Sequence, residues 1–212
     1  MRQRLGQVRI ATPIDGDFGG TWIGVNQFAV TAALLNRYHD APVEGTPAMV
    51  SRGLLLRSLL DARSGRGLIG RLVKTALKNY LPFTIAAFDR TATVRVADWN
   101  GRDLVVSRVT KPGLVRTSSG FDQRAAERTR QARFDEAGTA GPITAPGLRT
   151  LHRDHHPAKG AFSVCMHRPD ARTRSLTEIR VARTTASVRY RAGSPCRART
   201  SQLIRLSLTR RG

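Results

Sequence analysis

Apolar residues fall into short blocks along the first part of the chain. Residues 22–25 and 28–35 are almost continuously apolar or β-branched, and the polar pair Asn26-Gln27 separates them. Two apolar runs joined by a turn are typical of a hairpin, and the longer run predicts a strand buried on both faces. Residues 1–20 show little apolar periodicity and end in a cluster of Gly and Asp, so we expect the folded pattern to begin at Thr21.

Helical spacing follows this hairpin. Ser51 stands where a helix N-cap is preferred, ahead of leucines that recur on one helical face. A second helix is predicted over residues 68–80 and ended by a proline. Residues 122–136 hold many charges and few apolar side chains, which favours an exposed helix capped by Asp122. Residues 138–147, rich in Gly and Pro, are expected to form a loop.

The clearest local signal is a three-stranded meander. Residues 82–88 and 93–99 have strand composition, and Asn100-Gly101 forms a two-residue turn into the apolar run at 104–106. Further strands are expected at residues 161–167, 176–181, 188–191 and 203–208. Successive strands lie too close in sequence for parallel crossovers, so the sheets should be antiparallel with helices outside them. The sequence therefore predicts an α+β fold, and we expect a single domain over residues 1–212 because no linker or repeat occurs.

Basic residues dominate the polar positions. The chain has 212 residues, with 36 Lys and Arg against 15 Asp and Glu, and a formal net charge of +21. A polyanion partner is one explanation, because clustered cations release counterions from phosphates. The basic residues are spread along the whole chain, however, and aromatic residues for base stacking make up only 6%. A GC-rich gene therefore explains the arginines better, and a basic nucleic-acid-binding protein is kept as an alternative function.

Targeting signals are missing from the sequence. No apolar stretch approaches the roughly 18 to 20 residues of a membrane-spanning helix, and the first 30 residues lack the apolar block of a secretory signal. We therefore expect a cytoplasmic protein without a membrane span. The sequence holds no signal for an oligomeric state.

Few residues suggest a metal site or a nucleophile. His152, His155 and His156 form an HxxHH cluster, but the Glu that zinc proteases place between the outer histidines is absent, so a solvated loop is favoured. Cys165 and Cys196 lie far apart without CxxC spacing, which indicates neither a disulfide framework nor a zinc site. Cys165 falls in an expected strand, where a thiol is more often a small buried hydrophobe than a nucleophile. The sequence predicts no metal and no other cofactor.

Three ordered blocks resemble a known family. The blocks are GGTWIGVN at 19–26 with ALLNRY at 33–38 and SRG at 51–53; PFT at 82–84 with WNG at 99–101 and SS at 118–119; and SVCMHRPDART at 163–173. They are similar to the amino-terminal half, the middle and a carboxyl-terminal block of the NRDE family, also called the transport and Golgi organisation 2 family. The resemblance covers roughly residues 13 to 208.

This family in turn resembles the N-terminal nucleophile hydrolases, which implies a four-layer αββα sandwich of antiparallel sheets. In those enzymes a terminal Cys, Ser or Thr is activated by its own α-amine, whose pKa is about 8. This chain begins Met1-Arg2 and has neither the terminal Cys nor the Asn-Arg-Asp-Glu tetrad. The resemblance therefore predicts a non-catalytic or amino-terminally incomplete member that lacks the first strands. An amide hydrolase with an N-terminal Cys is the alternative if the true start lies upstream.

The resemblance also suggests a ligand site between the sheets. Its expected residues are Trp22, Asn26, Asn36, Ser118, Ser119 and His167, with Asn36 at the oxyanion region of related hydrolases. The expected ligand is a small molecule or an acyl-type compound. The structural alternative places Trp22 in the core, both asparagines in turns and the serines at a strand end, and we favour it for each residue.

Overall fold

The computed structural model describes residues 1–38, 50–91, 93–110, 113–139 and 141–209. Their elements are β1 Arg2–Leu5, β2 Val8–Ala11, β3 Ile23–Asn26, β4 Thr31–Asn36, α1 Arg52–Leu59, α2 Gly65–Val73, β5 Phe83–Phe88, β6 Val94–Trp99, β7 Leu104–Val109, α3 Gln123–Ala137, α4 Ala145–Leu151, β8 Ser175–Val181, β9 Thr185–Ala192 and β10 Gln202–Ser207. The chain divides into two compact units: Met1–Pro112 with Glu178–Arg189 and Leu203–Gly212, and Gly113–Thr177 with Tyr190–Gln202.

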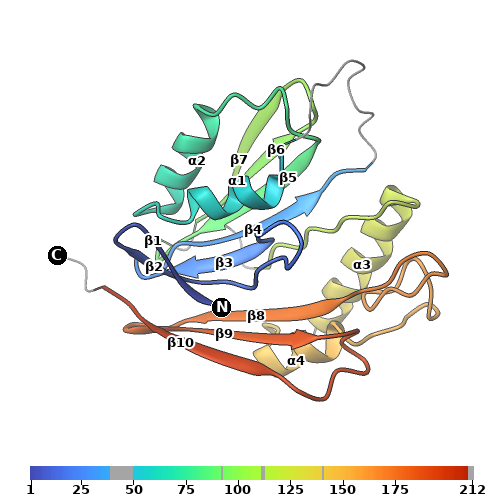
Figure 1. Ribbon diagram of the computed structural model, residues 1–212. Coiled ribbons are helices and arrows are strands. Elements are labelled where there is room, and N and C mark those ends of the chain that lie inside the picture. The colour runs from blue at the N-terminus through green and yellow to red at the C-terminus, as the bar shows by residue number, and fades with distance from the viewer. Residues whose placement is uncertain (39–49, 92, 111–112, 140, 210–212) are drawn as a thin grey trace. The chain divides into compact units, whose positions relative to one another are not determined.

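A seven-stranded antiparallel sheet forms the frame of the first unit (Figure 1). Its spatial order is β1-β2-β3-β4-β5-β6-β7, so each strand pairs with the next one in the sequence. The expected meander is confirmed, and Gly101 occupies its last turn with φ +98. The expected two-residue length of that turn is wrong: Trp99 pairs with Leu104, so the turn spans residues 100–103. The Asn100 side chain stabilises the longer turn by accepting from the N–H groups of Arg102 and Asp103, both at 2.7 Å.

The amino-terminal residues form a hairpin that the sequence reading did not predict. β1 and β2 pair in register, with Leu5 opposite Val8, and β2 continues the sheet through β3. Ile10 and Ala11 are the fully buried residues of this hairpin. The expectation that the folded pattern begins at Thr21 is wrong, because two buried side chains are too few to give a periodic signal.

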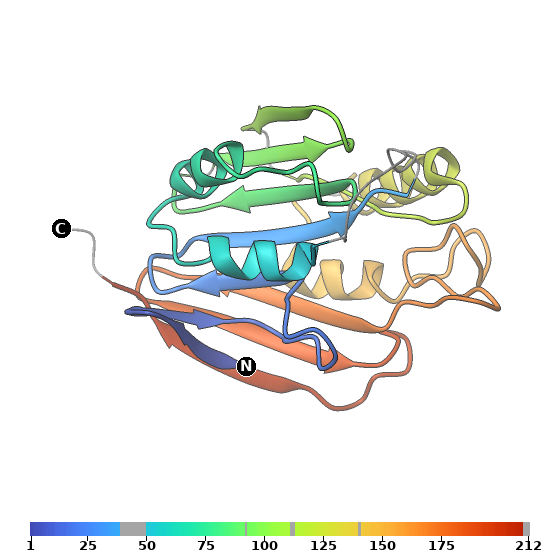
Figure 2. The ribbon, with the colours of Figure 1, turned by 45° about the horizontal axis from the view of Figure 1, so that its top comes forward.

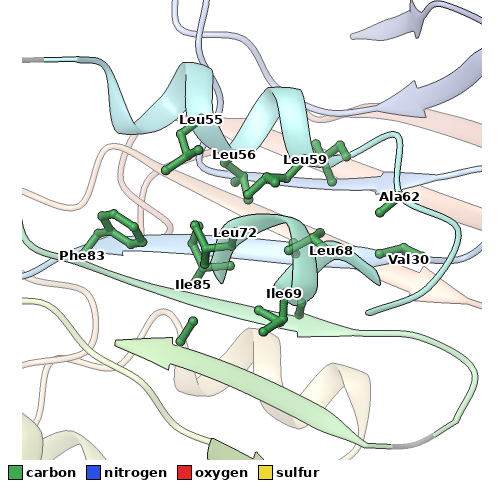
Figure 3. Packing of buried hydrophobic residues seen from close by; sticks show 14 of the residues in the cluster. Val30, Leu55, Leu56, Leu59, Ala62, Leu68, Ile69, Leu72, Phe83 and Ile85 are labelled. Atoms are coloured by element: carbon green, nitrogen blue, oxygen red, sulfur yellow. The ribbon is translucent and has the colours of Figure 1, made fainter. Parts of the chain in front are cut away.

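Two helices cover one face of this sheet (Figure 2). Ser51 caps α1 as predicted, since its hydroxyl accepts from the N–H of Leu54, and Ser64 caps α2 in the same way. The second helix therefore begins and ends earlier than residues 68–80. Leu55, Leu56 and Leu59 of α1 and the buried residues of α2 pack on β4, β5 and β6 (Figure 3). Each fully buried leucine contributes roughly 1.5–3 kcal/mol.

The remaining strands of the described residues form a three-stranded sheet in the order β10-β9-β8. Ala186 and Val188 of β9 and Leu206 of β10 form a second buried cluster with Ala11 and Val25 of the first sheet. All five residues belong to the first unit. Two antiparallel sheets and flanking helices confirm the predicted α+β class.

The second unit contains α3 and α4, which pack on each other. Asp122 caps α3 as expected, accepting from the N–H of Ala125 at 2.9 Å. The predicted loop at 138–147, of which residue 140 lies outside the described residues, is partly wrong because α4 begins at Ala145. Residues 161–167 do not form the expected strand: they bend, and only an isolated bridge joins His167 to Arg172. Within the described residues, no helix is both long and apolar enough to cross a bilayer.

The Ser51 cap gives a first testable prediction. Ser51→Ala removes the acceptor for the N–H of Leu54 and should lower the free energy of unfolding by about 1 kcal/mol. Ser58→Ala is the matched control, because Ser58 lies exposed inside the same helix and alanine has the higher helix propensity. Urea unfolding followed by tryptophan fluorescence compares the two variants. Equal stability of both proteins would contradict the capping role.

Candidate functional site

Asn26 ends β3 and is fully buried. Its Nδ2 donates hydrogen bonds to the carbonyl oxygens of Leu60 at 2.9 Å and Ala62 at 2.6 Å, just after α1. Its Oδ1 accepts from the backbone N–H groups of Phe28 at 2.9 Å and Val30 at 3.0 Å. Both hydrogens of this amide, and two acceptor directions of its oxygen, are used inside the protein. Asn26 therefore ties the turn between β3 and β4 to the end of α1.

Trp22 and Asn36 lie on the same sheet. Trp22 directly precedes β3, and its carbonyl oxygen accepts from the N–H of Leu34 at 2.8 Å. Asn36 ends β4, and its Nδ2 donates to the hydroxyl of Tyr38 at 2.9 Å. These contacts are with neighbours in the sheet, so a ligand role for either residue stays a prediction.

Ser118 and Ser119 lie in the second unit, on the segment that leads into α3. The carbonyl oxygen of Ser118 accepts from Arg130 Nη1 at 3.3 Å. The N–H of Ser119 donates to Gln123 Oε1 at 2.6 Å, and its hydroxyl accepts from the N–H of Phe121 at 3.3 Å. These are local contacts of a polar turn at the start of a helix.

Arg130 organises this part of the second unit. From α3, its Nε donates to the carbonyl oxygen of Ser163 at 3.2 Å and its Nη2 to that of Ala161 at 3.1 Å. Its Nη1 also donates to the hydroxyl of Thr117. These partners are neutral oxygens, and no carboxylate among the described residues forms an ion pair with this guanidinium. Burial lowers the pKa of Arg130, with no neighbouring charge to offset it.

A cavity of about 280 Å³ lies beside Arg130. Its apolar walls come from the segment before α3, from both helices and from the bend that follows: Leu114, Val115, Phe134, Leu148, Leu151 and Val164. The polar groups on its wall are Arg116, Thr117, Arg130 and His152. The cavity thus combines a largely apolar lining with a half-buried positive charge.

His167 lies in a cluster of thiols and imidazoles. The ligand atoms of His155, Cys165, His167 and Cys196 all lie within 4.8 Å of one another. Burial and, after it, the charges of Lys159 and His155 lower the pKa of His167. Burial raises the pKa of the Cys165 thiol to about 11. The four side chains are the described residues that could hold a metal ion.

The first unit has an arginine-lined groove. Arg2, Arg4 and Arg9 of the amino-terminal hairpin line it together with Arg205 of β10, around a volume of about 440 Å³. Arg2 donates to the carbonyl oxygen of Arg205 at 2.5 Å, and Arg9 to that of Ser207 at 3.2 Å. Among the residues that the structure describes, no aromatic side chain lines the groove, so it offers charge without a surface for base stacking.

The sequence profile of the family Transport and Golgi organisation 2 matches residues 5–133. The chain belongs to this family. The match includes the glycine-rich block before β3 and the start of α1, two places where the sequence shows its resemblance. A search of curated protein sequences found no match.

Two solved structures were compared with this family member. Penicillin V acylase from Agrobacterium tumefaciens is similar with a TM-score of 0.59 and 13% identity, over 95% of this chain and 70% of that one. A mutant conjugated bile acid hydrolase from Clostridium perfringens matches with a TM-score of 0.45 and 13% identity, over 94% and 76% of the two chains. The first similarity confirms the predicted likeness to N-terminal nucleophile hydrolases at the level of the fold.

Two groups of residues escaped the sequence reading. Arg130 is one of many arginines, and nothing in a single sequence marks the one that becomes buried. The cluster of His155, Cys165, His167 and Cys196 left one signal in the sequence. Cys165 and His167 are two residues apart, and residues at this spacing share a face of a predicted strand. The spacing of the cysteines alone, or of the histidines alone, does not contain that signal.

Proposed function

We propose that this family member binds a small acyl-type carboxylate in the cavity beside Arg130. The observation that supports this is a half-buried guanidinium, with neutral partners only, on the wall of an apolar cavity. A carboxylate would compensate the charge, and charge-assisted hydrogen bonds to arginine are among the strongest in proteins. Four of the five N–H groups of Arg130 are used by Thr117, Ser118, Ala161 and Ser163, which leaves one on Nη2 for a ligand oxygen.

The size and lining of the cavity define the ligand class. Its volume of about 280 Å³ is at the lower end of the roughly 300–1,000 Å³ of small-molecule sites. Leu148 and Leu151 of α4 line it together with Phe134 of α3, so an aliphatic chain would bury its surface there. A medium-chain carboxylate fits these features better than a polar metabolite or a long lipid.

Binding is proposed without hydrolysis. Acyl-transfer chemistry needs an activated nucleophile next to a base. Thr117 supplies the hydroxyl on the cavity wall, and that oxygen already accepts from Arg130. A guanidinium donor cannot take the proton of a nucleophile, so the arrangement suits recognition of a carboxylate.

Calorimetric titration with octanoate and 1-octanol tests this function. Octanoate should bind the wild-type protein at least tenfold more tightly than octanol, because only the carboxylate meets the charge. Arg130→Gln should weaken octanoate binding by roughly 10- to 100-fold, the equivalent of a charged hydrogen bond worth about 1.5–3 kcal/mol. Arg128→Gln removes an exposed arginine from the same helix and should leave the affinity unchanged.

A second variant separates binding from folding, because Arg130 also holds neighbouring segments together. Leu148 is 38% exposed at the cavity, so Leu148→Trp should fill the space without disturbing the core. This variant should weaken octanoate binding while its thermal unfolding matches that of the wild type. Equal affinity of the wild type for octanoate and octanol would overturn the proposal, as would an equal effect of Arg128→Gln.

A further inference from the structure

Four side chains that are distant in sequence converge in the second unit. His155 follows α4, Cys165 and His167 lie in the bend after it, and Cys196 follows β9. His167 Nε2 lies 3.6 Å from Cys165 Sγ and 3.4 Å from Cys196 Sγ. The rings of His155 and His167 meet edge to face, with centroids 5.2 Å apart. We call these four residues the thiol–imidazole cluster.

The local backbone fixes the cluster through two adjacent anchors. The N–H of Cys165 donates to the carbonyl oxygen of Asp154 at 3.0 Å, and the N–H of His167 donates to that of Gly160 at 3.0 Å. The side chain of Asp154 is itself held by Arg133 Nε at 2.6 Å. Cys165 and His167 are two residues apart in the bend, and Cys165 Sγ lies 3.6 Å from His167 Nε2. The ligand atoms are thus positioned by the protein before any ion binds.

One atom of the cluster lacks a partner. His155 Nε2 is buried, and no residue in the described part of the chain forms a hydrogen bond with it. A buried polar atom without a partner is rare in folded proteins and calls for a bound water or ion. Both sulfur atoms of the cluster contact the same Nε2 of His167.

We propose that His155, Cys165, His167 and Cys196 bind one Zn²⁺ ion in a four-coordinate structural site. Two thiolates and two imidazoles are a common zinc ligand set, and bonds of about 2.3 Å to sulfur and 2.0–2.1 Å to nitrogen place tetrahedral ligands about 3.3–3.8 Å apart. The observed sulfur–nitrogen distances of 3.6 and 3.4 Å fall in this range. On binding, each thiol loses its proton to solvent. The two negative charges of the thiolates then balance the two positive charges of the ion.

The second unit has a small apolar core that a bound ion would help to stabilise. Its buried apolar side chains among the described residues are Ala126, Leu151, Cys165 and Leu176. A core this small supplies little hydrophobic stabilisation, and small folds commonly add a disulfide or a structural metal. Four protein ligands leave no open position for a reacting water, which distinguishes a structural site from a catalytic one. The ion would join the bend at 155–167 to the segment after β9.

Metal titration of the reduced, full-length protein tests the site. After treatment with chelator and a thiol reductant, Co²⁺ should bind with 1:1 stoichiometry and show the thiolate charge-transfer and d–d absorption bands of a tetrahedral site with two sulfurs. Zn²⁺ should displace it. X-ray absorption of the zinc-loaded wild type should show two sulfur and two nitrogen neighbours, a result that depends on no variant.

Matched substitutions identify the ligands. Cys196→Ser and His155→Gln should each weaken Zn²⁺ binding by roughly a hundredfold or more, since changes to groups that only support a ligand already cost 10- to 100-fold. His156→Gln changes the exposed neighbour of His155 and should leave the affinity as it is. Circular dichroism of the zinc-free variants controls for folding.

Any one of the following outcomes would overturn the proposal. The first is a folded, reduced wild type that binds no stoichiometric Co²⁺ or Zn²⁺. The second is an equal loss of affinity in His155→Gln and His156→Gln. The third is an X-ray absorption spectrum without two sulfur neighbours, or a Cys165–Cys196 disulfide that persists under reducing conditions and excludes the metal.

Discussion

Replacement of Asn26 by alanine should lower the free energy of unfolding of the first unit by about 3–5 kcal/mol, because each buried group left without its partner costs roughly 1–3 kcal/mol. The side chain is fully buried and makes four hydrogen bonds to the backbone. Alanine leaves the carbonyl oxygens of Leu60 and Ala62, and the N–H groups of Phe28 and Val30, without their partner. Leu60, Ala62 and Val30 are buried, so water cannot freely replace the amide at these three positions.

The two tryptophans make the measurement specific. Trp22 and Trp99 both belong to the first unit, so fluorescence during urea unfolding reports on the sheet that contains Asn26. Asn26→Asp should be at least as destabilising as the alanine variant. A carboxylate cannot donate to the oxygens of Leu60 and Ala62, and its charge would be buried.

Asn36→Ala is the matched control for this prediction. Asn36 ends the adjacent strand β4 and donates to Tyr38 near the surface, so its loss should cost about 0.5–1.5 kcal/mol. A stability change below 1 kcal/mol in Asn26→Ala would show that the amide bonds are not a link between the turn and the end of α1.

Local chemistry made several elements of the fold predictable. Helix α1 begins where Ser51 supplies an acceptor, and α3 begins where Asp122 does, because capping depends on residues within one turn. The meander follows from apolar runs and from a turn that needs Gly101 at positive φ. These signals involve residues only a few positions apart, so a single sequence contains them in full.

Long-range convergence explains what remained unpredicted. The strand expected at 161–167 is a bend instead, because its polar contacts run to Asp154, Gly160 and Arg130 rather than to a neighbouring strand. Arg130 belongs to α3 and Asp154 follows α4, and no local pattern in the sequence identifies these two partners. The same holds for Cys196, which contacts His167 although the two residues are 29 positions apart in the sequence.

Substitution of Gly20 by alanine is the second change with a large expected effect. A Cβ atom at this position would lie 2.7 Å from the carbonyl carbon of Gly53, 2.9 Å from its Cα and 3.0 Å from the nitrogen of Leu54. All three are backbone atoms at the start of α1, so no side chain can rotate away. The helix would have to move away from the segment before β3, and we expect a loss of about 2–4 kcal/mol in the free energy of unfolding.

This contact gives a physical reason for the glycines in the two blocks that show the family resemblance. The N–H of Thr21 donates to the carbonyl oxygen of Gly53 at 3.1 Å, and Arg57 Nη1 donates to that of Gly19 at 2.8 Å. The segment before β3 and the first turn of α1 therefore lie backbone to backbone. The glycines at 19–20 and at 53, which resemble the family, therefore lie on the two segments that form this backbone contact.

Two other glycine substitutions serve as comparisons for the stability of Gly20→Ala. Gly53→Ala meets Thr21 N at 3.1 Å and Gly20 Cα at 3.3 Å, distances that a shift of a few tenths of an ångström relieves, so it should cost less than Gly20→Ala. Gly16→Ala meets no atom within 4 Å and should stay within about 0.5 kcal/mol of the wild type. Tryptophan fluorescence in urea should therefore rank Gly20→Ala as least stable, then Gly53→Ala, then Gly16→Ala. A Gly20→Ala protein as stable as Gly16→Ala would mean that α1 does not rest on this backbone contact.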